Sequence, residues 1–445
     1  MAHRTSNNIF RFTRLIAILF IITAFIFDSP SEILSGMIRI IQSPGNLVTD
    51  YVSIGGVGAA LLNSGLMTLL SLKILKKYDY NFAPSSFLHL MLLAGYSFWG
   101  KNLFNSAPIF LGLFLYIKVS DKTSQKHLSS GLLGTALAPA VSIVYFSSDR
   151  LWIKAMALLL GVILGFIMIP IFKKTLHLTF GLNLYTMGFV AGIVSLGVNF
   201  FITKILKIDV DILSTTPQHS QELFLLFFLF FTILLIYYGF LFLNHHFVQF
   251  KKMTLILKEE NKISQSLREI LQTFKFSIYG LIGLVVVYLL KEPLTGPLAG
   301  SILIFTGFSA YHYRFSHFLF PALGVAFSYE FFLGGLASES GLIALFFVST
   351  MAPFCHHYGN TWGFLSGTLF PFVSKLLNLT HNGINLYNSG FAGGVTVLLL
   401  FLLMNLPLFK KHPPLRKSKQ RQESLEIKVM KRISAHIKFT ENELS

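Results

Sequence analysis

The chain has 445 residues, of which 53% are apolar and only 12% are charged. Because soluble domains usually carry about 25% charged residues, this composition excludes an ordinary soluble protein and indicates a polytopic membrane protein. The net charge of +17 gathers before the first apolar run, in residues 251–275 and in residues 410–445. That pattern is typical of cytoplasmic anchors and not of a nucleic-acid-binding surface.

The N-terminal part, residues 1–80, contains two apolar runs of about the length that crosses a bilayer. We predict spans at residues 13–27 and 53–75, with a short interfacial helix at residues 31–42 between them. The second span contains IGGVGAALLNSG, and such small residues let helix backbones approach closely in lipid.

Two sets of apolar segments follow, and we assign them to repeat half A (residues 81–205) and repeat half B (residues 276–408). Their segments are 86–100, 103–117, 130–146, 152–172 and 183–203 in half A, and 276–290, 297–311, 318–335, 340–353, 362–377 and 385–406 in half B. Residues 206–275 join the halves through a span and an amphipathic cytoplasmic linker, and residues 409–445 form a basic cytoplasmic tail. The expected fold is all-α and polytopic, with two homologous tandem halves and about 10–12 membrane segments.

The halves are recognised by a repeated motif. GLNLYTMGFVAG at residues 181–192 returns as GINLYNSGFAGG at residues 383–394, with seven of twelve positions identical at a constant offset of 202. Extended back to Gly161 and Gly363, the match holds ten identities in 32 positions. Chance similarity between apolar segments favours Leu and Ile, whereas these identities fall mostly on Gly, Asn, Tyr and Phe. The pattern therefore indicates an internal duplication.

The match continues upstream with a shifted offset. KNLFNSAPIFLG at residues 101–112 aligns with GPLAGSILIFTG at residues 296–307, and Gly134 aligns with Gly324. This alignment predicts that half B carries about a dozen extra residues between Gly324 and Gly363, an interval that ends in the polar sequence MAPFCHHYGNTWG.

Several apolar segments are short and open with Asn, Gly, Ser or Pro, which favours helices that begin inside the membrane. Irregular backbone at that depth is tolerated where protein buries it or where it lines a wet cavity. Asn183 and Asn385 are candidate caps of such helices, and corresponding broken helices in two halves indicate a transport site near the midplane. The alternative is that the glycine-rich stretches are ordinary tight helix crossings. The candidate polar lining residues are Asn102, Asn105, Asn183, Tyr185, Asn385 and Tyr387.

The most polar patch flanked by apolar sequence is Cys355-His356-His357 with Asn360. We consider His356, His357 and Asn360 as residues of a pore mouth or solute site, with a plain interfacial loop as the alternative. Adjacent histidines on a helix point about 100° apart, and no HxxxH, CxxC or HExxH pattern is present. We therefore predict neither a metal nor another cofactor. Cys355 is the single cysteine, which excludes an intrachain disulfide.

Two charges fall within apolar segments, Lys101 in half A and Glu330 in half B. Charged groups in a membrane are costly and are usually paired or functional. Lys101 and Glu330 are therefore candidates for coupling transport to an ion, either as a pair between the halves or separately. Either side chain could instead reach an interface.

The repeated GxNLYxxGFxxG motif, together with IGGVGAALLNSG and CHHYGNTWG, resembles a family of bacterial integral membrane proteins. That family carries a twice-repeated domain of unknown function, is found mainly in Firmicutes, and implies a bacterial inner-membrane location. A second resemblance is to the urea transporter family. GPLAGSILI at residues 296–304 is similar to that family's Asn-Pro-Leu-Ser-Gly-Leu-Leu-Ile stretch, with Gly296 in place of Asn, and the two GxN turns are similar to its Gly-Tyr/Phe-Asn turn. This resemblance implies pore helices that start in mid-membrane.

These features predict an inner-membrane transporter or channel for a small, neutral polar solute, with its path between the two halves. The Asn and Tyr side chains would replace the hydrogen bonds that water gives such a solute. The partners expected are the lipid bilayer and the solute, with no nucleic acid, and a homo-oligomer stays open. Both termini are expected in the cytoplasm.

Three alternatives remain at this point. An ion-coupled secondary transporter would need a buried acid such as Glu330. A membrane-embedded enzyme would need Cys355 or its neighbouring histidines. An assembly or scaffold protein would tolerate changes in the Asn and Tyr lining and would depend on the basic tail.

Overall fold

The computed structural model describes residues 2–78, 80, 82–210, 216–246, 265–311 and 313–404. The predicted linker at residues 251–275 lies partly, and the predicted tail at residues 409–445 wholly, outside these ranges. The helices up to the end of half A are α1 (Ala2–Phe27), α2 (Pro30–Gln42), α3 (Tyr51–Gly55), α4 (Val57–Lys77), α5 (Pro84–Tyr96), α6 (Leu103–Val119), η1 (Lys122–His127), α7 (Leu128–Leu132), η2 (Leu133–Leu137), α8 (Ala138–Phe146), α9 (Leu151–Thr175), α10 (Thr186–Phe200) and η3 (Phe201–Ile205).

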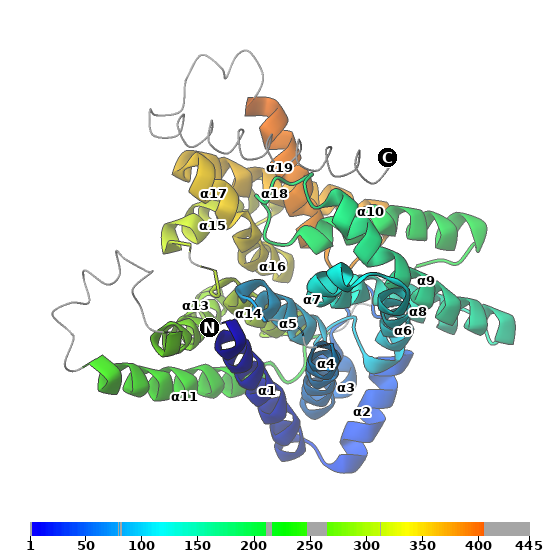
Figure 1. The fold of residues 1–445 in the computed structure, drawn as a ribbon, viewed down its shortest axis with the longest axis horizontal. Helices are drawn as coiled ribbons and strands as arrows, with labels where there is room; N and C mark the ends of the chain where they lie inside the picture. The colour runs from blue at the N-terminus through cyan, green and yellow to red at the C-terminus, as the bar shows by residue number, and fades with distance from the viewer. Residues whose placement is uncertain are drawn as a thin grey trace.

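The remaining helices are α11 (Ser220–His246), α13 (Gln265–Leu289), α14 (Gly296–Phe308), α15 (Phe315–Ser328), η6 (Tyr329–Leu333), α16 (Glu339–Phe347), η7 (Val348–Met351), α17 (Ala352–Tyr358), α18 (Asn360–His381) and α19 (Asn388–Met404). Figure 1 shows α6, α8 and α9 of half A on one side and α15 to α18 of half B on the other. Helices α5 and α14 lie between these groups.

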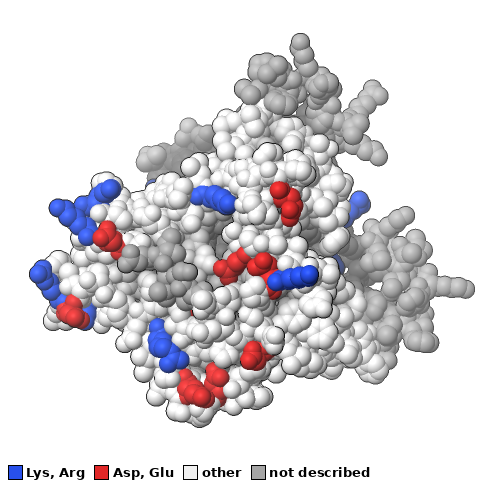
Figure 2. All heavy atoms as spheres, turned by 180° about the vertical axis from the view of Figure 1, so that it is seen from behind, with Lys and Arg blue, Asp and Glu red and all other residues white. Residues whose placement is uncertain are grey.

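The protein is an all-α polytopic membrane protein. Nine helices among the described residues are long and apolar enough to cross a membrane, and four shorter apolar helices accompany them. Large apolar side chains of α11 face outward, among them Ile236 with 67% of its surface exposed, as expected of a helix against lipid. Figure 2 shows a face that is mostly uncharged, with Lys, Arg, Asp and Glu side chains scattered across its middle and lower part.

The small residues of α4 let its backbone approach that of α1 closely, as the sequence predicts. A Cβ atom added at Gly58 would lie 2.7 Å from the Ala24 carbonyl oxygen, and one added at Gly65 would lie 2.8 Å from that of Ala17. The backbones of α1 and α4 are therefore in direct contact. In the α11–α13 pair a glycine makes room for a ring instead, since a Cβ at Gly280 would lie 2.4 Å from the Phe231 ring.

One matched pair of helix crossings corrects the upstream alignment. Helix α6 crosses α9 where a Cβ at Gly112 would lie 1.9 Å from Val162 O, and α15 crosses α18 where a Cβ at Gly324 would lie 2.1 Å from Phe364 O. Val162 and Phe364 are 202 residues apart, which is the offset of the repeated motif. The crossings therefore pair Gly112 with Gly324, and they pair α6 with α15, not with α14.

This pairing also reverses the predicted length difference. Gly112 is followed 53 residues later by Gly165, whereas Gly324 is followed 43 residues later by Gly367. Both later glycines pack equally tightly, with an added Cβ 1.9 Å from Ile109 O and 1.8 Å from Pro321 O. The extra residues therefore lie in half A, and the prediction that half B is longer here was wrong. The wrong alignment of residues 101–112 with residues 296–307 rested on a few shared residues, most of them apolar.

The central helices α5 and α14 are short. Each has 13 residues, which at 1.5 Å per residue gives about 20 Å, less than the roughly 30 Å hydrocarbon core of a bilayer. They cross where a Cβ at Gly95 would lie 2.5 Å from Gly300 O and one at Gly300 would lie 2.3 Å from Gly95 O. Two short helices, one from each half, thus meet backbone to backbone inside the protein (Figure 1).

Each half also contains a broken helix. In half A, α7 and α8 are separated by the 3-10 segment η2, and in half B, α16 and α17 are separated by the 3-10 segment η7. In both cases the second piece begins with Ala-Pro, at Ala138-Pro139 and at Ala352-Pro353. Proline lacks an N–H group and interrupts the hydrogen-bond ladder of a helix, so this shared pair marks the break.

Candidate functional site

The repeated GxNLY motif forms the same turn twice. Gly181 and Gly383 adopt φ values of +70° and +71°, a left-handed conformation that glycine adopts without steric cost. Asn183 Oδ1 accepts the Tyr185 N–H at 2.9 Å, and Asn385 Oδ1 accepts the Tyr387 N–H at 3.0 Å. The helices begin later, at Thr186 and Asn388. Each asparagine therefore holds the turn before its helix and is not the cap residue itself.

The two turns interlock across the halves. The Leu184 N–H of half A donates to Thr350 O of half B at 3.1 Å, and the Leu386 N–H of half B donates to Ala136 O of half A at 3.1 Å. Both acceptors belong to the 3-10 breaks, where a helix leaves carbonyl groups without an intrahelical partner. Each turn is thus bound to the broken helix of the opposite half.

Helices α10 and α19 pack against each other directly after these turns. A Cβ at Gly188 would lie 2.7 Å from the Gly390 Cα, and a Cβ at Gly390 would lie 2.7 Å from the Gly188 Cα. These are repeat-equivalent residues that face each other, so an approximate two-fold relation passes through this contact. The glycines shared by the two motif copies are explained by this close approach.

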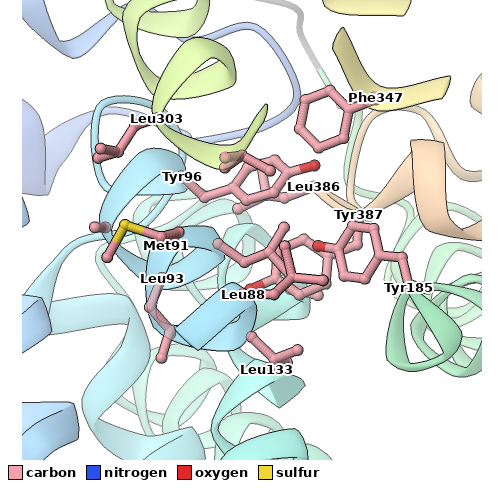
Figure 3. Close-up of a cluster of buried hydrophobic side chains, with 14 of the residues drawn as sticks. Leu88, Met91, Leu93, Tyr96, Leu133, Tyr185, Leu303, Phe347, Leu386 and Tyr387 are labelled. Carbon is pink, nitrogen blue, oxygen red and sulfur yellow. The ribbon is translucent and has the colours of Figure 1, made fainter. Parts of the chain in front are cut away.

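Three tyrosines meet where the two turns and α5 come together. The Tyr387 ring centroid lies 4.8 Å from that of Tyr185 and 4.6 Å from that of Tyr96. Figure 3 shows Tyr185 pointing toward Tyr387, with Tyr96, Leu386 and Phe347 beside them. All three tyrosines are 1% exposed or less. We call Tyr96, Tyr185 and Tyr387 the tyrosine cluster.

Lys101 reaches this cluster from half A. It is fully buried, and its Nζ donates a hydrogen bond to Tyr387 Oη. Nζ also lies 4.2 Å from the Tyr387 ring centroid and 5.5 Å from that of Tyr96, which is cation–π distance. No carboxylate of the described residues lies within 4.0 Å of this ammonium group. A buried charge without an ionic partner costs several kcal/mol even after relaxation.

The two turns differ in how their amides are used. Asn183 Nδ2 donates to Gly390 O at 3.0 Å, and its Oδ1 also accepts from Thr350 Oγ1. Asn385 Nδ2 is buried and has no hydrogen-bond partner among the described residues, and the same holds for Trp99 Nε1 beside Tyr96. Both of these unused groups are donors. Their burial without a partner is unusual enough to require an explanation.

Asn102 and Asn105 are engaged in the protein itself. Asn102 caps α6 and forms a reciprocal capping box with Asn105, with hydrogen bonds of 2.9 and 3.0 Å. Asn102 Nδ2 also donates to Tyr51 Oη at 3.2 Å, and Asn105 Nδ2 donates to Gly100 O at 2.9 Å. A helix thus begins at a buried, capped position, as the sequence predicts. The amide donors of both residues are used to hold that start.

Glu330 lies apart from Lys101. It is exposed in η6, and its Oε1 accepts the Leu336 N–H at 2.9 Å. The Lys101–Glu330 ion pair, one of the options that the sequence left open, does not form among the described residues. The acid that is buried in the described part of the chain is Asp50, which is 3% exposed and accepts the N–H groups of Val52 and Gly296 at 2.9 and 3.1 Å.

His356, His357 and Asn360 lie at the end of α17 and the start of α18, outside the tyrosine cluster. His356 is exposed, and its ring centroid lies 4.8 Å from that of His317 and 5.5 Å from that of Tyr313. Asn360 is exposed as well. Within the described ranges no group of three or more His, Cys, Asp or Glu side chains could hold a metal ion.

Sequence reasoning missed Tyr96, Trp99 and Asp50. Tyr96 and Trp99 resemble ordinary apolar core residues by type, and nothing in their spacing sets them apart. A usable signal existed in the Ala-Pro pairs at residues 138–139 and 352–353, which repeat at an offset of 214. That offset would have placed the broken helices in equivalent positions, although it differs by two residues from the offset of 212 between Gly112 and Gly324.

Comparison with known proteins gives a family and no activity. A family model described as "Protein of unknown function (DUF1576)" matches residues 29–206 and 249–406. No curated protein and no solved structure matches the chain. The two matched stretches cover most of the chain and fit a domain that occurs twice, in agreement with the internal repeat. The chain is therefore a multi-pass membrane protein that belongs to the DUF1576 family, whose domain it carries twice.

Proposed function

We propose that this protein is a bacterial inner-membrane transporter for a small polar solute, with its path between half A and half B. The observation that carries the proposal is the junction itself. Two short helices, two broken helices and two interlocked turns enclose a buried polar cluster. Discontinuous helices in corresponding positions of two repeats are the usual setting of a transport site, because their free backbone groups and helix ends can bind solute.

The burial of the cluster favours a transporter with alternating access over an open channel. Lys101, Tyr185 and Tyr387 are each 1% exposed or less, whereas a conducting pore keeps its lining residues in contact with water. In a transporter such burial corresponds to an occluded arrangement. The mirrored contacts across the junction supply two equivalent hinges for rocking one half against the other.

An enzyme that uses Cys355 is less well supported. The thiol is buried, and its Sγ lies 4.0 Å from Asn360 Oδ1. A Cβ added at Gly363 would lie 2.3 Å from this sulfur, so the thiol is packed against the neighbouring helix. A nucleophile needs access to its substrate and an adjacent base.

The orientation is part of the proposal. Lys76 and Lys77 end α4, and the basic residues of the N-terminus and of the C-terminal sequence flank the outermost apolar segments. The positive-inside rule then places these ends in the cytoplasm.

The test is solute flux into proteoliposomes that contain the full chain. Stopped-flow light scattering follows swelling after a challenge with urea, glycerol or small amides, and radiolabelled uptake follows amino acids and organic acids. We expect at least one solute to enter faster than into empty liposomes. The double variant Asn183→Ala/Asn385→Ala should lose most of that flux, because both turns at the junction are released.

The matched control is Asn199→Ala. Asn199 lies on α10 and donates to Thr380 O of half B at 2.9 Å, so it also joins the halves, but it lies outside the turns. Flux in this variant should stay within about twofold of the wild type. If no solute enters faster than into empty liposomes, the transport proposal fails.

A further inference from the structure

We propose that the transported solute is a small monocarboxylate, and that Lys101 carries one proton across with it. This inference rests on the proposed function and deepens it. It replaces the neutral solute expected from the Asn and Tyr lining, and it needs no buried acid.

The first step is charge balance around Lys101. Its ammonium group has zero exposed surface. The groups that face it are the hydroxyl and ring of Tyr387 before α19 and the ring of Tyr96 of α5. Asn63 of α4 instead holds the Lys101 backbone, since its Nδ2 donates to the Lys101 carbonyl at 2.7 Å. No Asp, Glu, Arg, His or other Lys pairs with it in the described part of the chain. No described residue supplies the negative charge that a charged Lys101 requires, and in this proposal the solute supplies it.

The second step is the character of the unused polar groups. Lys101 has further N–H groups beyond the one given to Tyr387, and Trp99 Nε1 and Asn385 Nδ2 are buried donors without partners. Two further buried atoms lack a partner: Tyr185 Oη, which can donate or accept, and Asn63 Oδ1, which accepts. An anion with several acceptor oxygens complements the donors of Lys101, Trp99 and Asn385. Tyr387, which accepts from Lys101, lies among apolar and aromatic side chains that include Phe347 and Leu386 (Figure 3). Such walls suit the carbon skeleton of an organic acid better than a hydrated inorganic ion.

The third step is the proton. When the site is empty and closed, the neutral amine avoids the cost of a buried charge. When a carboxylate enters, the lone pair of Nζ takes one proton from solution, an N–H bond forms, and the ion pair is neutral as a whole. On the other side the carboxylate leaves, the same N–H bond breaks, and the proton follows. One anion and one proton cross per cycle, and no net charge moves.

The test uses wild-type proteoliposomes loaded with a pH-sensitive dye and challenged with radiolabelled lactate, pyruvate or pyroglutamate. Leak of the protonated acids is subtracted with empty liposomes. We expect uptake of at least one acid together with acidification of the lumen, and we expect the rate to stay the same when a potassium gradient with valinomycin sets the membrane potential.

Two changes at Lys101 separate charge from proton transfer. Lys101→Met should lose at least about tenfold of the uptake, equivalent to roughly 1.4 kcal/mol, since the charge is gone. Lys101→Arg keeps a charge that cannot release its proton. It should therefore exchange internal for external carboxylate but lose net uptake with acidification. Thermal unfolding of each variant checks that it is folded.

Lys375→Met is the matched control. Lys375 is an exposed lysine whose Nζ lies 5.4 Å from the Tyr329 ring centroid, so it has a similar ring contact without burial. Its uptake should equal that of the wild type.

The outcomes distinguish this inference from the proposed function. If urea, glycerol or an amide crosses at the same rate in Lys101→Met as in the wild type, the carboxylate inference fails and the transporter proposal stands. Carboxylate uptake that persists in Lys101→Met, uptake that moves net charge, or uptake of nitrate or chloride alone would each overturn it as well. Absence of flux for every solute would overturn both.

Discussion

Half A and half B share a scaffold but differ in their chemistry. Both contain a short central helix, a glycine-packed helix crossing, a broken helix and a GxNLY turn bound to the opposite half. At the loop after the short helix they diverge, since half A carries the buried Lys101 and half B carries Tyr313, which contacts the rings of His317 and His356. Backbone contacts are thus kept in duplicate, while the buried Lys101 side chain, which has no buried lysine as its counterpart among the described residues of half B, breaks the symmetry.

This difference indicates that the contacts shared by both halves allow the movement, and that the residues in which the halves differ bind the solute. A symmetric junction can move in two equivalent ways, which is what alternating access needs. A second lysine at the same junction would bring two like charges together in a low dielectric, where their repulsion is strong. A single lysine at the junction avoids this repulsion.

The largest effect should come from the crossings that both halves share. In Gly165→Val and Gly367→Val the new side chain meets a backbone carbonyl, because even its Cβ would lie 1.9 and 1.8 Å from the oxygen. We expect each variant to lose about 3 kcal/mol or more of stability, at the upper end of overpacking costs. Thermal unfolding in detergent with gel filtration measures this.

Gly197→Val is the control for these variants, because a Cβ at Gly197 meets nothing within 4 Å. It should unfold close to the wild-type temperature. Equal behaviour of Gly165→Val and Gly197→Val would show that the tight crossings are incorrect.

The next effect concerns Lys101, the residue by which half A differs most clearly from half B. Lys101→Met replaces a buried polar group that lacks an ionic partner with an apolar chain of similar length, and burying such a group costs about 1–3 kcal/mol. We expect a higher unfolding temperature for Lys101→Met without added solute, whereas Tyr313→Phe should have little effect. A destabilised Lys101→Met would argue for an internal counter-charge. Adding a carboxylate should stabilise the wild type and leave the methionine variant unchanged.

A smaller effect tests the two turns. Asn183→Ala removes the bonds to Gly390 O and Thr350 Oγ1 as well as the turn bond, whereas Asn385→Ala removes the turn bond to Tyr387 N. With about 1 kcal/mol net for each hydrogen bond, Asn183→Ala should be the more destabilising by roughly 1–2 kcal/mol. Guanidinium or thermal denaturation of the two variants side by side measures the difference. Equal losses would mean that Asn385 Nδ2 has a partner inside the protein.

The smallest effect concerns Asp50, whose carboxylate accepts a backbone N–H at the start of α14. In half A the start of α5 is held instead by Ser86 Oγ, which accepts the Ala83 N–H at 3.0 Å. Burial raises the pKa of Asp50, so the folded state holds this proton more tightly than the unfolded state. Stability from this group is therefore greatest at low pH and is lost as the pH rises through the raised pKa.

Asp50→Asn keeps an acceptor oxygen and does not titrate, and asparagine and aspartate cap helices about equally well. The variant should be more stable than the wild type at neutral pH, and the difference should shrink to within about 0.5 kcal/mol as the pH falls. Unfolding temperatures over a pH series test this, and a difference that grows on acidification would contradict it.

Much of the fold follows from the sequence. Apolar runs, small residues and the repeated motif are local features, and they predict the membrane class, the positions of nearly all helices and the duplication. The upstream register was mispredicted because Leu, Ile, Phe and Gly recur by chance in any membrane helix. Only the paired crossings at Gly112 and Gly324 resolved it.

The sequence by itself determined that this chain spans a membrane in two homologous halves, because apolar runs and repeated motifs are properties of neighbouring residues along the chain. It also singled out Lys101, Tyr185 and Tyr387 by type. Only the tertiary structure decided that these three meet with Tyr96, and that Glu330 lies apart from them. Contacts between residues up to 286 positions apart depend on how helices cross, and side-chain type alone does not fix those crossings.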